Sequence, residues 1–189
     1  MGNNGGTYVE LLTETQYLRV EEAAREKNEY VAGRTYAMSG VTFAHDRIAI
    51  NLMTMLCQPA RSRGCSVYSS DVKVKVEEFG CFYYPDVSMT CEPFTPASVF
   101  ITAPRLLIEV LSPSTETIDR REKMIAYRSI KSLAEYAIAQ QDAPLIEVYR
   151  RTPTGDWTLT EYRHNESVLF ESFTGASVAV PVSDIYDWL

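Results

Sequence analysis

The chain has 189 residues, of which 46% are hydrophobic and 23% charged, and its formal net charge is -7. This composition is typical of a globular protein with a core of its own, and it excludes disordered, collagen-like and low-complexity chains. The negative charge argues against a protein that coats nucleic acid without specificity, because such proteins carry a basic surface. We expect one domain over residues 1–189, with 1–9 as a flexible tail.

Targeting signals and cysteine motifs are missing from the sequence. No basic segment is followed by an apolar one near the first residue, and no apolar run approaches the roughly 20 residues that a membrane helix needs. We therefore expect a cytoplasmic location. The four cysteines, at 57, 65, 81 and 91, contain no C-x-x-C pair. They indicate neither a zinc site nor a disulfide framework, so we expect reduced, mostly buried thiols.

The first third of the chain alternates between helical and extended patterns. Thr13 and Gln16 have the spacing of a capping box, which predicts a helix over about 14–27. Two short extended pieces are predicted around Gly33. A second helix is predicted from about residue 44, with an apolar stripe at 48, 52, 55 and 56, and it should end near Pro59.

The middle of the chain changes to the two-residue period of strands. Alternating residues predict strands at about 72–76 and 82–90, and the nearly all-apolar run 105–111 is typical of a strand buried on both faces. A helix over about 116–131 and a strand over 135–140 follow, which together predict a crossover between parallel strands. A hairpin of 145–151 with 157–162 and a short helix over 182–189 complete the prediction.

Two carboxylates interrupt apolar strands. Glu109 stands in the middle of the run 106–111, and Asp86 follows Pro85 inside another apolar segment. A buried ionised carboxylate must be paired, protonated or bound to a metal. If the two strands are neighbours, the two carboxylates converge, and a hard divalent cation such as Mg2+ would relieve their repulsion. The alternative is that each carboxylate is a surface or salt-bridged strand residue.

Lys123 lies at the start of the apolar stripe of the predicted helix 116–131. Positions 127, 130 and 134 continue that stripe, so the lysine points inward, toward the end of the strand that carries Glu109. It could orient a water molecule or stabilise charge on a phosphorus centre. The alternative is an ordinary pair with Asp119, four residues earlier, worth only a few tenths of a kcal/mol.

Several segments in one order carry a family resemblance. They are Pro85-Asp86-Val87, then Leu107 to Ser114, then Asp119 to Lys123 with Tyr127, and Glu135-Tyr136, preceded by Glu29 to Gly33 with Met38, Gly40 and His45. This set resembles the bacterial restriction-endonuclease family within the PD-(D/E)XK nuclease superfamily, over roughly residues 10–151. The resemblance implies an α/β fold with a restriction-endonuclease-like core, in which a mixed β-sheet is flanked by helices.

The resemblance also implies a phosphodiesterase site that depends on Mg2+, for which Mn2+ could substitute. Asp86 and Glu109 match the metal ligands, with the backbone carbonyl of Val110 as a third. Leu111 occupies the position where a lysine is usual, so Lys123 is the migrated replacement. Glu29 matches an upstream acidic position that completes the site. His45 and Asp71 are further candidates at its rim.

The function expected from these residues is a metal-dependent DNA endonuclease, acting as a homodimer because a duplex has two strands to cut. The missing lysine at position 111 and the acidic net charge leave two alternatives open. One is a nuclease-fold binding or regulatory module without catalysis, and the other is an oligomeric scaffold with salt-bridged carboxylates. Zinc chemistry, a serine nucleophile and a phosphate-binding glycine loop are not indicated, because none of their motifs is present.

Overall fold

The computed structural model describes residues 11–112 and 116–188, so the predicted tail 1–9 lies outside the described residues. The helical segments are α1 (Glu14–Glu22), α2 (Phe43–Arg61), η1 (Glu77–Phe79), α3 (Glu116–Ile118), the π-helix η2 (Asp119–Lys123), α4 (Met124–Ser129) and α5 (Val182–Ile185). None of the helices in the described ranges is long and apolar enough to cross a membrane.

The strands form three sheets. They are β1 (Asn28–Val31), β2 (Arg34–Ala37), β3 (Ser66–Ser69), β4 (Lys73–Val76), β5 (Cys81–Tyr83), β6 (Val87–Thr90), β7 (Phe100–Ile101), β8 (Pro104–Val110), β9 (Glu135–Ala139), β10 (Leu145–Arg151), β11 (Trp157–Arg163), β12 (Ser167–Phe170) and β13 (Val178–Pro181). One sheet has the order β2-β1-β5-β4-β7, the second β11-β10-β9-β8-β6-β3, and the third pairs β12 with β13.

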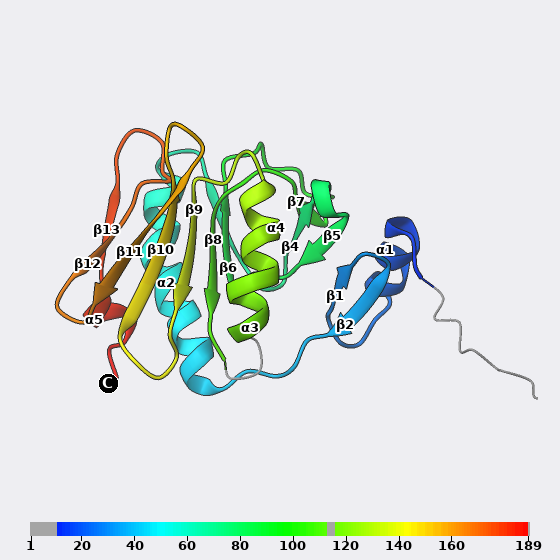
Figure 1. The fold of residues 1–189 in the computed structure, drawn as a ribbon, viewed down its shortest axis with the longest axis horizontal. Helices are drawn as coiled ribbons and strands as arrows, with labels where there is room; N and C mark the ends of the chain where they lie inside the picture. The colour runs from blue at the N-terminus through cyan, green and yellow to red at the C-terminus, as the bar shows by residue number, and fades with distance from the viewer. Residues whose placement is uncertain (1–10, 113–115, 189) are drawn as a thin grey trace, which may run out of the picture.

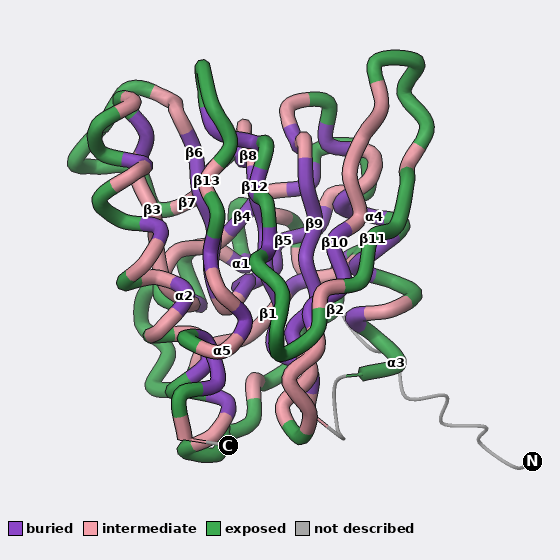
Figure 2. Tube along the Cα trace, turned by 90° about the vertical axis from the view of Figure 1, so that its left-hand side faces the viewer, coloured by how far each residue is buried: buried purple, intermediate pink, exposed green. Residues whose placement is uncertain are grey.

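The six-stranded sheet is mixed, as the sequence predicted. β8 and β9 are parallel, with Glu109 beside Ile138, and the segment between them forms the predicted helical crossover. The other pairs in this sheet are antiparallel. β9 is buried along its whole length and lies in the middle of the fold, whereas β11 is largely exposed (Figure 2).

Helices cover both faces of this sheet. Successive residues of β8 point to opposite sides, so its apolar side chains lie on both faces. Leu106, Ile108 and Val110 pack in one cluster with the buried stripe of α2. Leu107 packs in a second cluster with Met124 and other residues of α4. Figure 1 shows α2 and α4 on opposite sides of β8 and β9. Glu109 faces the same side as Leu107, toward α4.

The predicted strand 82–90 is in fact two strands in two different sheets. β5 belongs to the five-stranded sheet and β6 to the six-stranded one, and Tyr84, Pro85 and Asp86 connect them. A proline cannot donate a ladder hydrogen bond, so pairing breaks at this point. The break places Asp86 next to the end of β8 rather than inside a continuous strand.

The helix boundaries differ modestly from the predicted ones. The capping box of α1 is confirmed, with the backbone N–H of Gln16 donating to Thr13 Oγ1 at 3.2 Å. α1 ends at Glu22 rather than near residue 27, because Asn28 already belongs to β1. α2 continues past Pro59 to Arg61, as a proline interrupts only one backbone hydrogen bond of the helix. Strands β12 and β13 were not predicted.

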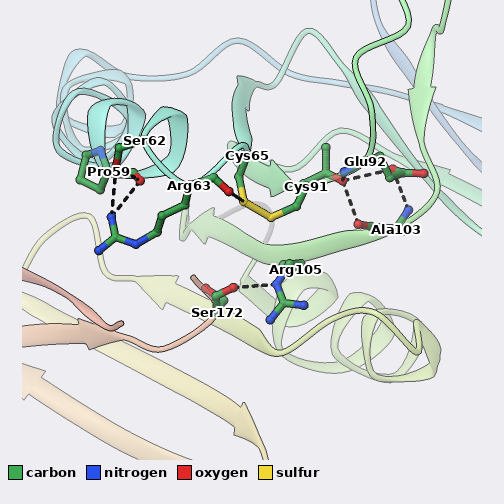
Figure 3. Close-up of a disulfide and its surroundings, with 10 residues drawn as sticks. Pro59, Ser62, Arg63, Cys65, Cys91, Glu92, Ala103, Arg105 and Ser172 are labelled. Atoms are coloured by element: carbon green, nitrogen blue, oxygen red, sulfur yellow. Dashed lines mark hydrogen bonds between the residues drawn. A yellow bond between two sulfur atoms is a disulfide. The ribbon is translucent and has the colours of Figure 1, made fainter. Parts of the chain in front are cut away.

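The expectation of four reduced cysteines is wrong. Cys65 and Cys91 form a disulfide (Figure 3). Cys57 is exposed and Cys81 is buried, both as free thiols. The two bonded residues lie just outside the antiparallel pair β3 and β6, in which Ser66 is opposite Thr90. Their Cα atoms are 4.0 Å apart. The register of these strands, which no local pattern reveals, brings the cysteines together.

Candidate active site

Asp86 is anchored to the end of the neighbouring strand. Its Oδ2 accepts a hydrogen bond of 2.7 Å from the backbone N–H of Val110, the last residue of β8. The same oxygen lies 3.3 Å from Nε2 of His45. The carboxylate is thus fixed beside the Val110 peptide group, and its side chain keeps 13% of its surface exposed.

Glu109 is buried on β8, with 4% of its side chain exposed. Its Oε1 accepts hydrogen bonds from Nζ of Lys123 at 3.1 Å and from the hydroxyl of Tyr127 at 2.8 Å. Burial raises the pKa of Glu109 well above its usual value; the Lys123 charge counters this, and nearby carboxylates add to it. The second donor is therefore important, since one ammonium cannot fully compensate several buried carboxylates.

Lys123 is the last residue of the π-helix and its ammonium is shared by three carboxylates. Nζ lies 3.0 Å from Glu29 Oε1, 3.1 Å from Glu109 Oε1 and 3.2 Å from Asp119 Oδ1. Burial alone would lower the pKa of this amine, but the three carboxylates outweigh burial and raise it well above its ordinary value. The lysine is therefore a fixed cation.

His45 lies in the first turn of α2, where Thr42 caps the helix. Burial lowers the pKa of His45, but a hydrogen bond with Asp86, the charge of that carboxylate and a hydrogen bond with the Val110 backbone outweigh it, so the pKa is raised. The imidazole is thereby held against the Asp86 carboxylate and the Val110 backbone. These are two of the groups that the family resemblance implies as metal ligands.

These side chains line one pocket of about 490 Å³. Its lining includes Glu29, His45, Asp86, Glu109, Asp119 and Lys123. Its lining includes residues from the carboxyl end of β8, the start of α2 and the short helix α3. These parts of the three elements lie at the lower edge of the molecule in Figure 1. The volume of the pocket is within the range of sites that bind small ligands or parts of larger ones.

Six of the seven predicted site residues therefore come together here. Glu29, His45, Asp86, Glu109, Val110 and Lys123 all line the pocket, whereas Asp71 is not among the described residues that do. Asp71 is 78% exposed and pairs with Lys27 at 2.7 Å. This pair lowers the pKa of Asp71. The structure thus does not bring Asp71 to the site.

Two further residues of the pocket region were not singled out as functional. Asp119 was weighed only as a surface partner of Lys123, yet 2% of its side chain is exposed. Tyr127 is fully buried and donates to Glu109. The signal for both was present, because positions 119, 123 and 127 repeat every four residues along one face. Leu111 is 6% exposed and packs in the core below α4.

Asp86, Glu109 and the Val110 carbonyl supply part of the coordination shell of a hard divalent cation. In the described ranges, no three His, Cys, Asp or Glu side chains form a group that could hold a metal ion. Asp86 and Glu109 supply only two such side chains, but together with a backbone carbonyl they match the way Mg2+ binds, with waters and substrate phosphate completing the shell. The pocket lining also holds four carboxylates against two groups that can carry positive charge, Lys123 and His45. The chemistry of these residues therefore fits a divalent cation.

Three arginines, Arg120, Arg150 and Arg151, make structural contacts. Arg120 forms two hydrogen bonds with Glu147, and Arg150 pairs with the fully buried Glu135 at 2.8 Å. Arg151 donates to the backbone carbonyls of Arg128, Ile130 and Leu133. These side chains are committed to holding α4 and β10 in place.

The fold and the pocket define a restriction-endonuclease-like protein, and comparison with known proteins agrees. A crystal structure titled as a "putative nuclease belonging to DUF820" from Anabaena variabilis superposes with a TM-score of 0.76, at 17% identity, over 94% of this chain and 98% of the other. This likeness shows the fold.

The family follows from the sequence comparison. The chain belongs to the Uma2 family, described as "Putative restriction endonuclease", which it matches over residues 15–182. Two uncharacterized proteins of Synechocystis sp. are similar to it. slr1290 is 37% identical over 90% of both chains, and sll1609 is 32% identical over 86% of this chain and 94% of the other. The resemblance drawn from the sequence is thus confirmed.

Proposed function

We propose that this protein is an endonuclease that hydrolyses phosphodiester bonds of DNA with the help of a divalent cation, Mg2+ or Mn2+. The observation that supports it is the meeting of Asp86, Glu109 and Lys123 in one pocket, from three separate segments of the chain. Family membership supports the same reaction class. Structural ion pairs alone would not require a pocket that opens onto both carboxylates.

Asp86, Glu109 and the backbone carbonyl of Val110 are the groups that would hold the cation. When bound, Mg2+ would supply Lewis acidity and offset negative charge on the phosphate. The Val110 amide fixes one oxygen of Asp86, and Tyr127 fixes one oxygen of Glu109. Both carboxylates are thereby oriented before any ligand arrives, which lowers the entropic cost of binding.

Lys123 is the group that would act on water and on the phosphate. Its ammonium remains protonated, because three carboxylates surround it. It can donate hydrogen bonds that orient an attacking water and stabilise charge that develops on phosphate oxygens. Glu29, 14% exposed and paired with Lys123, completes the acidic wall of the pocket.

Cleavage of DNA by alanine variants tests the proposal. With Mg2+ or Mn2+, the wild-type protein should cut DNA, and Asp86→Ala and Glu109→Ala should lose at least about 100-fold in rate, as expected when a metal ligand is removed. Glu161→Ala is the matched control, since Glu161 is an exposed carboxylate of β11. Cleavage that persists unchanged in both pocket variants would overturn the proposal.

A catalytically inactive binding module is the second candidate. It is favoured by the full engagement of Lys123 in ion pairs and by the apolar Leu111 at the usual lysine position. This candidate predicts that DNA or another partner binds to the protein without hydrolysis in either metal. A gel-shift assay run beside the cleavage assay separates the two functions.

We also propose that the protein acts as a homodimer, because cutting both strands of a duplex favours two sites. The mass in solution, measured by light scattering with and without DNA, tests this. A mass of one chain under both conditions would contradict it.

A further inference from the structure

Asp119 is a buried carboxylate beside Lys123. Only 2% of its side chain is exposed, and it lines the pocket. Its Oδ1 lies 3.2 Å from Nζ of Lys123 but accepts no hydrogen bond from any described group. Burying a carboxylate oxygen without a hydrogen bond costs free energy, so this placement suggests a role in the site.

The first and last residues of the π-helix η2 both line the pocket. Asp119 is its first residue and Lys123 its last, and both are buried, while Arg121 and Glu122 between them are exposed. π-helical turns are rare and occur frequently at functional sites. The other two partners of Lys123, Glu29 and Glu109, come from strands β1 and β8. Of these three partners, Asp119 is thus the one that belongs to the same helical segment as the lysine.

The pairing of Lys123 with Glu109 conflicts with the proposed metal site. The ammonium and Tyr127 both occupy Oε1 of Glu109, and a divalent cation on the same carboxylate would compete with the ammonium for its charge. Two cations near one carboxylate also repel each other. Lys123 can stay in the pocket only if other carboxylates hold it there.

We propose that Asp119 is a positioning residue for Lys123. Its carboxylate retains the ammonium beside the pocket when Glu109 engages the divalent cation, and Glu29 assists from the other side. This inference rests on the proposed function, because it assumes a cation on Glu109. It assigns Asp119 a role beyond a helical ion pair.

Chemical labelling of Lys123 tests the proposal on the full-length protein. An amine-acetylating ester is applied with and without Mn2+, and acetylation of each lysine is measured by mass spectrometry. Wild type, Asp119→Asn and Glu122→Gln are compared. Glu122 is the matched control, since it is an exposed carboxylate in the same helical turn. The exposed Lys131 of each protein serves as the internal reference.

In wild type and Glu122→Gln, Lys123 should stay protected whether or not Mn2+ is present. In Asp119→Asn, Mn2+ should increase the labelling rate of Lys123 about five-fold. Without the Asp119 carboxylate, the lysine is released from the pocket in a larger fraction of molecules when Mn2+ binds Glu109. Asp119→Ala gives the same test should the asparagine variant fail to fold.

Three results would overturn the inference in distinguishable ways. Suppose that Mn2+ raises the Tm of wild type and of Asp119→Asn, but the labelling rate of Lys123 is the same in the two proteins. The positioning role is then wrong and the metal site stands. Labelling that is already fast in Asp119→Asn without Mn2+ likewise contradicts it, since the role is then structural. If Mn2+ stabilises neither protein, the metal site itself is wrong and the inference falls with it.

Discussion

The Nζ atom of Lys123 lies 3.1 Å from Oε1 of Glu109, and the hydroxyl of Tyr127 donates to the same oxygen at 2.8 Å. The two donors are one helical turn apart and approach from the face that α4 presents to β8. A single carboxylate oxygen is thus held by a cation and a neutral hydroxyl. This arrangement makes Tyr127 the residue through which the orientation of Glu109 can be changed without altering charge.

Tyr127→Phe removes that hydroxyl and keeps the ring contacts with Tyr83 and Tyr136. A hydrogen bond to a charged group stabilises by about 1.5–3 kcal/mol, so unfolding in urea should show a loss of that size. Loss of such a partner should weaken Mn2+ binding by about ten-fold. Tyr30→Phe is the control: it removes the hydroxyl that donates to the carbonyl of Leu12, neither residue is among the described ones that line the pocket, and Mn2+ binding should be unchanged. Equal Mn2+ affinities in both variants would contradict the role of Tyr127.

His45 should contribute to stability in a pH-dependent way. Its pKa is raised in the folded protein, since Asp86 and the Val110 backbone outweigh the lowering by burial. Its contribution is therefore fully present below the unfolded-state pKa of about 6.5 and is lost as the pH rises through the higher folded-state pKa. The stability difference between wild type and His45→Gln, measured in urea without metal, should shrink from about pH 6 upward.

The matched control is His164→Gln, because His164 is exposed in a turn of the chain. Its replacement should change the free energy of unfolding little, because the side chain is exposed. A difference for His45→Gln that grows with rising pH would show that the imidazole is held neutral, against this account.

The disulfide should contribute substantially to stability. It closes a loop between Cys65 and Cys91, 26 positions apart, for which the entropy of the unfolded chain corresponds to about 3–4 kcal/mol. The double variant Cys65→Ser with Cys91→Ser should therefore unfold at lower urea concentration, and reducing agent should lower the midpoint of wild type but not of the variant. Cys57→Ser, at an exposed thiol, should behave as wild type. A wild-type midpoint that ignores reducing agent would refute this.

Arg150 should contribute to the stability of the fold and not to catalysis. It pairs with Glu135, which is fully buried, so Arg150→Met leaves a buried charge without its partner and should cost about 3–5 kcal/mol. Arg163→Met removes an exposed pair with Glu161 and should cost at most about 1 kcal/mol. Urea unfolding of the two variants gives the comparison. Equal losses would mean that burial of Glu135 does not set the cost.

The sequence predicted those parts of the site whose signal is local. A carboxylate inside an apolar strand stands out, so Asp86 and Glu109 could be singled out, and the inward position of Lys123 followed from the apolar stripe of its helix. Asp119 lies on the same stripe, but an acidic residue four positions from a lysine is usually a surface partner. Only the π-helical turn and the strands around it show that it is buried.

The features that sequence could not predict depend on contacts between distant segments. Pro85 indicates an interruption of a strand, but not that β5 and β6 belong to different sheets. Cys65 and Cys91 meet only because β3 pairs with β6 in one register. Asp71 has the same chemistry as the carboxylates that line the pocket. It lies instead in an exposed turn, where it pairs with Lys27.

The central claim is that Asp86 and Glu109 share one divalent cation, and thermal unfolding with and without Mn2+ tests it most directly. For a dissociation constant near 1 mM, about 10 mM Mn2+ should stabilise the wild type by about 1.4 kcal/mol. That corresponds to a rise in Tm of about 3–5 °C. Asp86→Ala and Glu109→Ala should lose this rise, while Glu161→Ala should keep it. An equal rise in all four proteins would show that the two carboxylates do not bind a common cation.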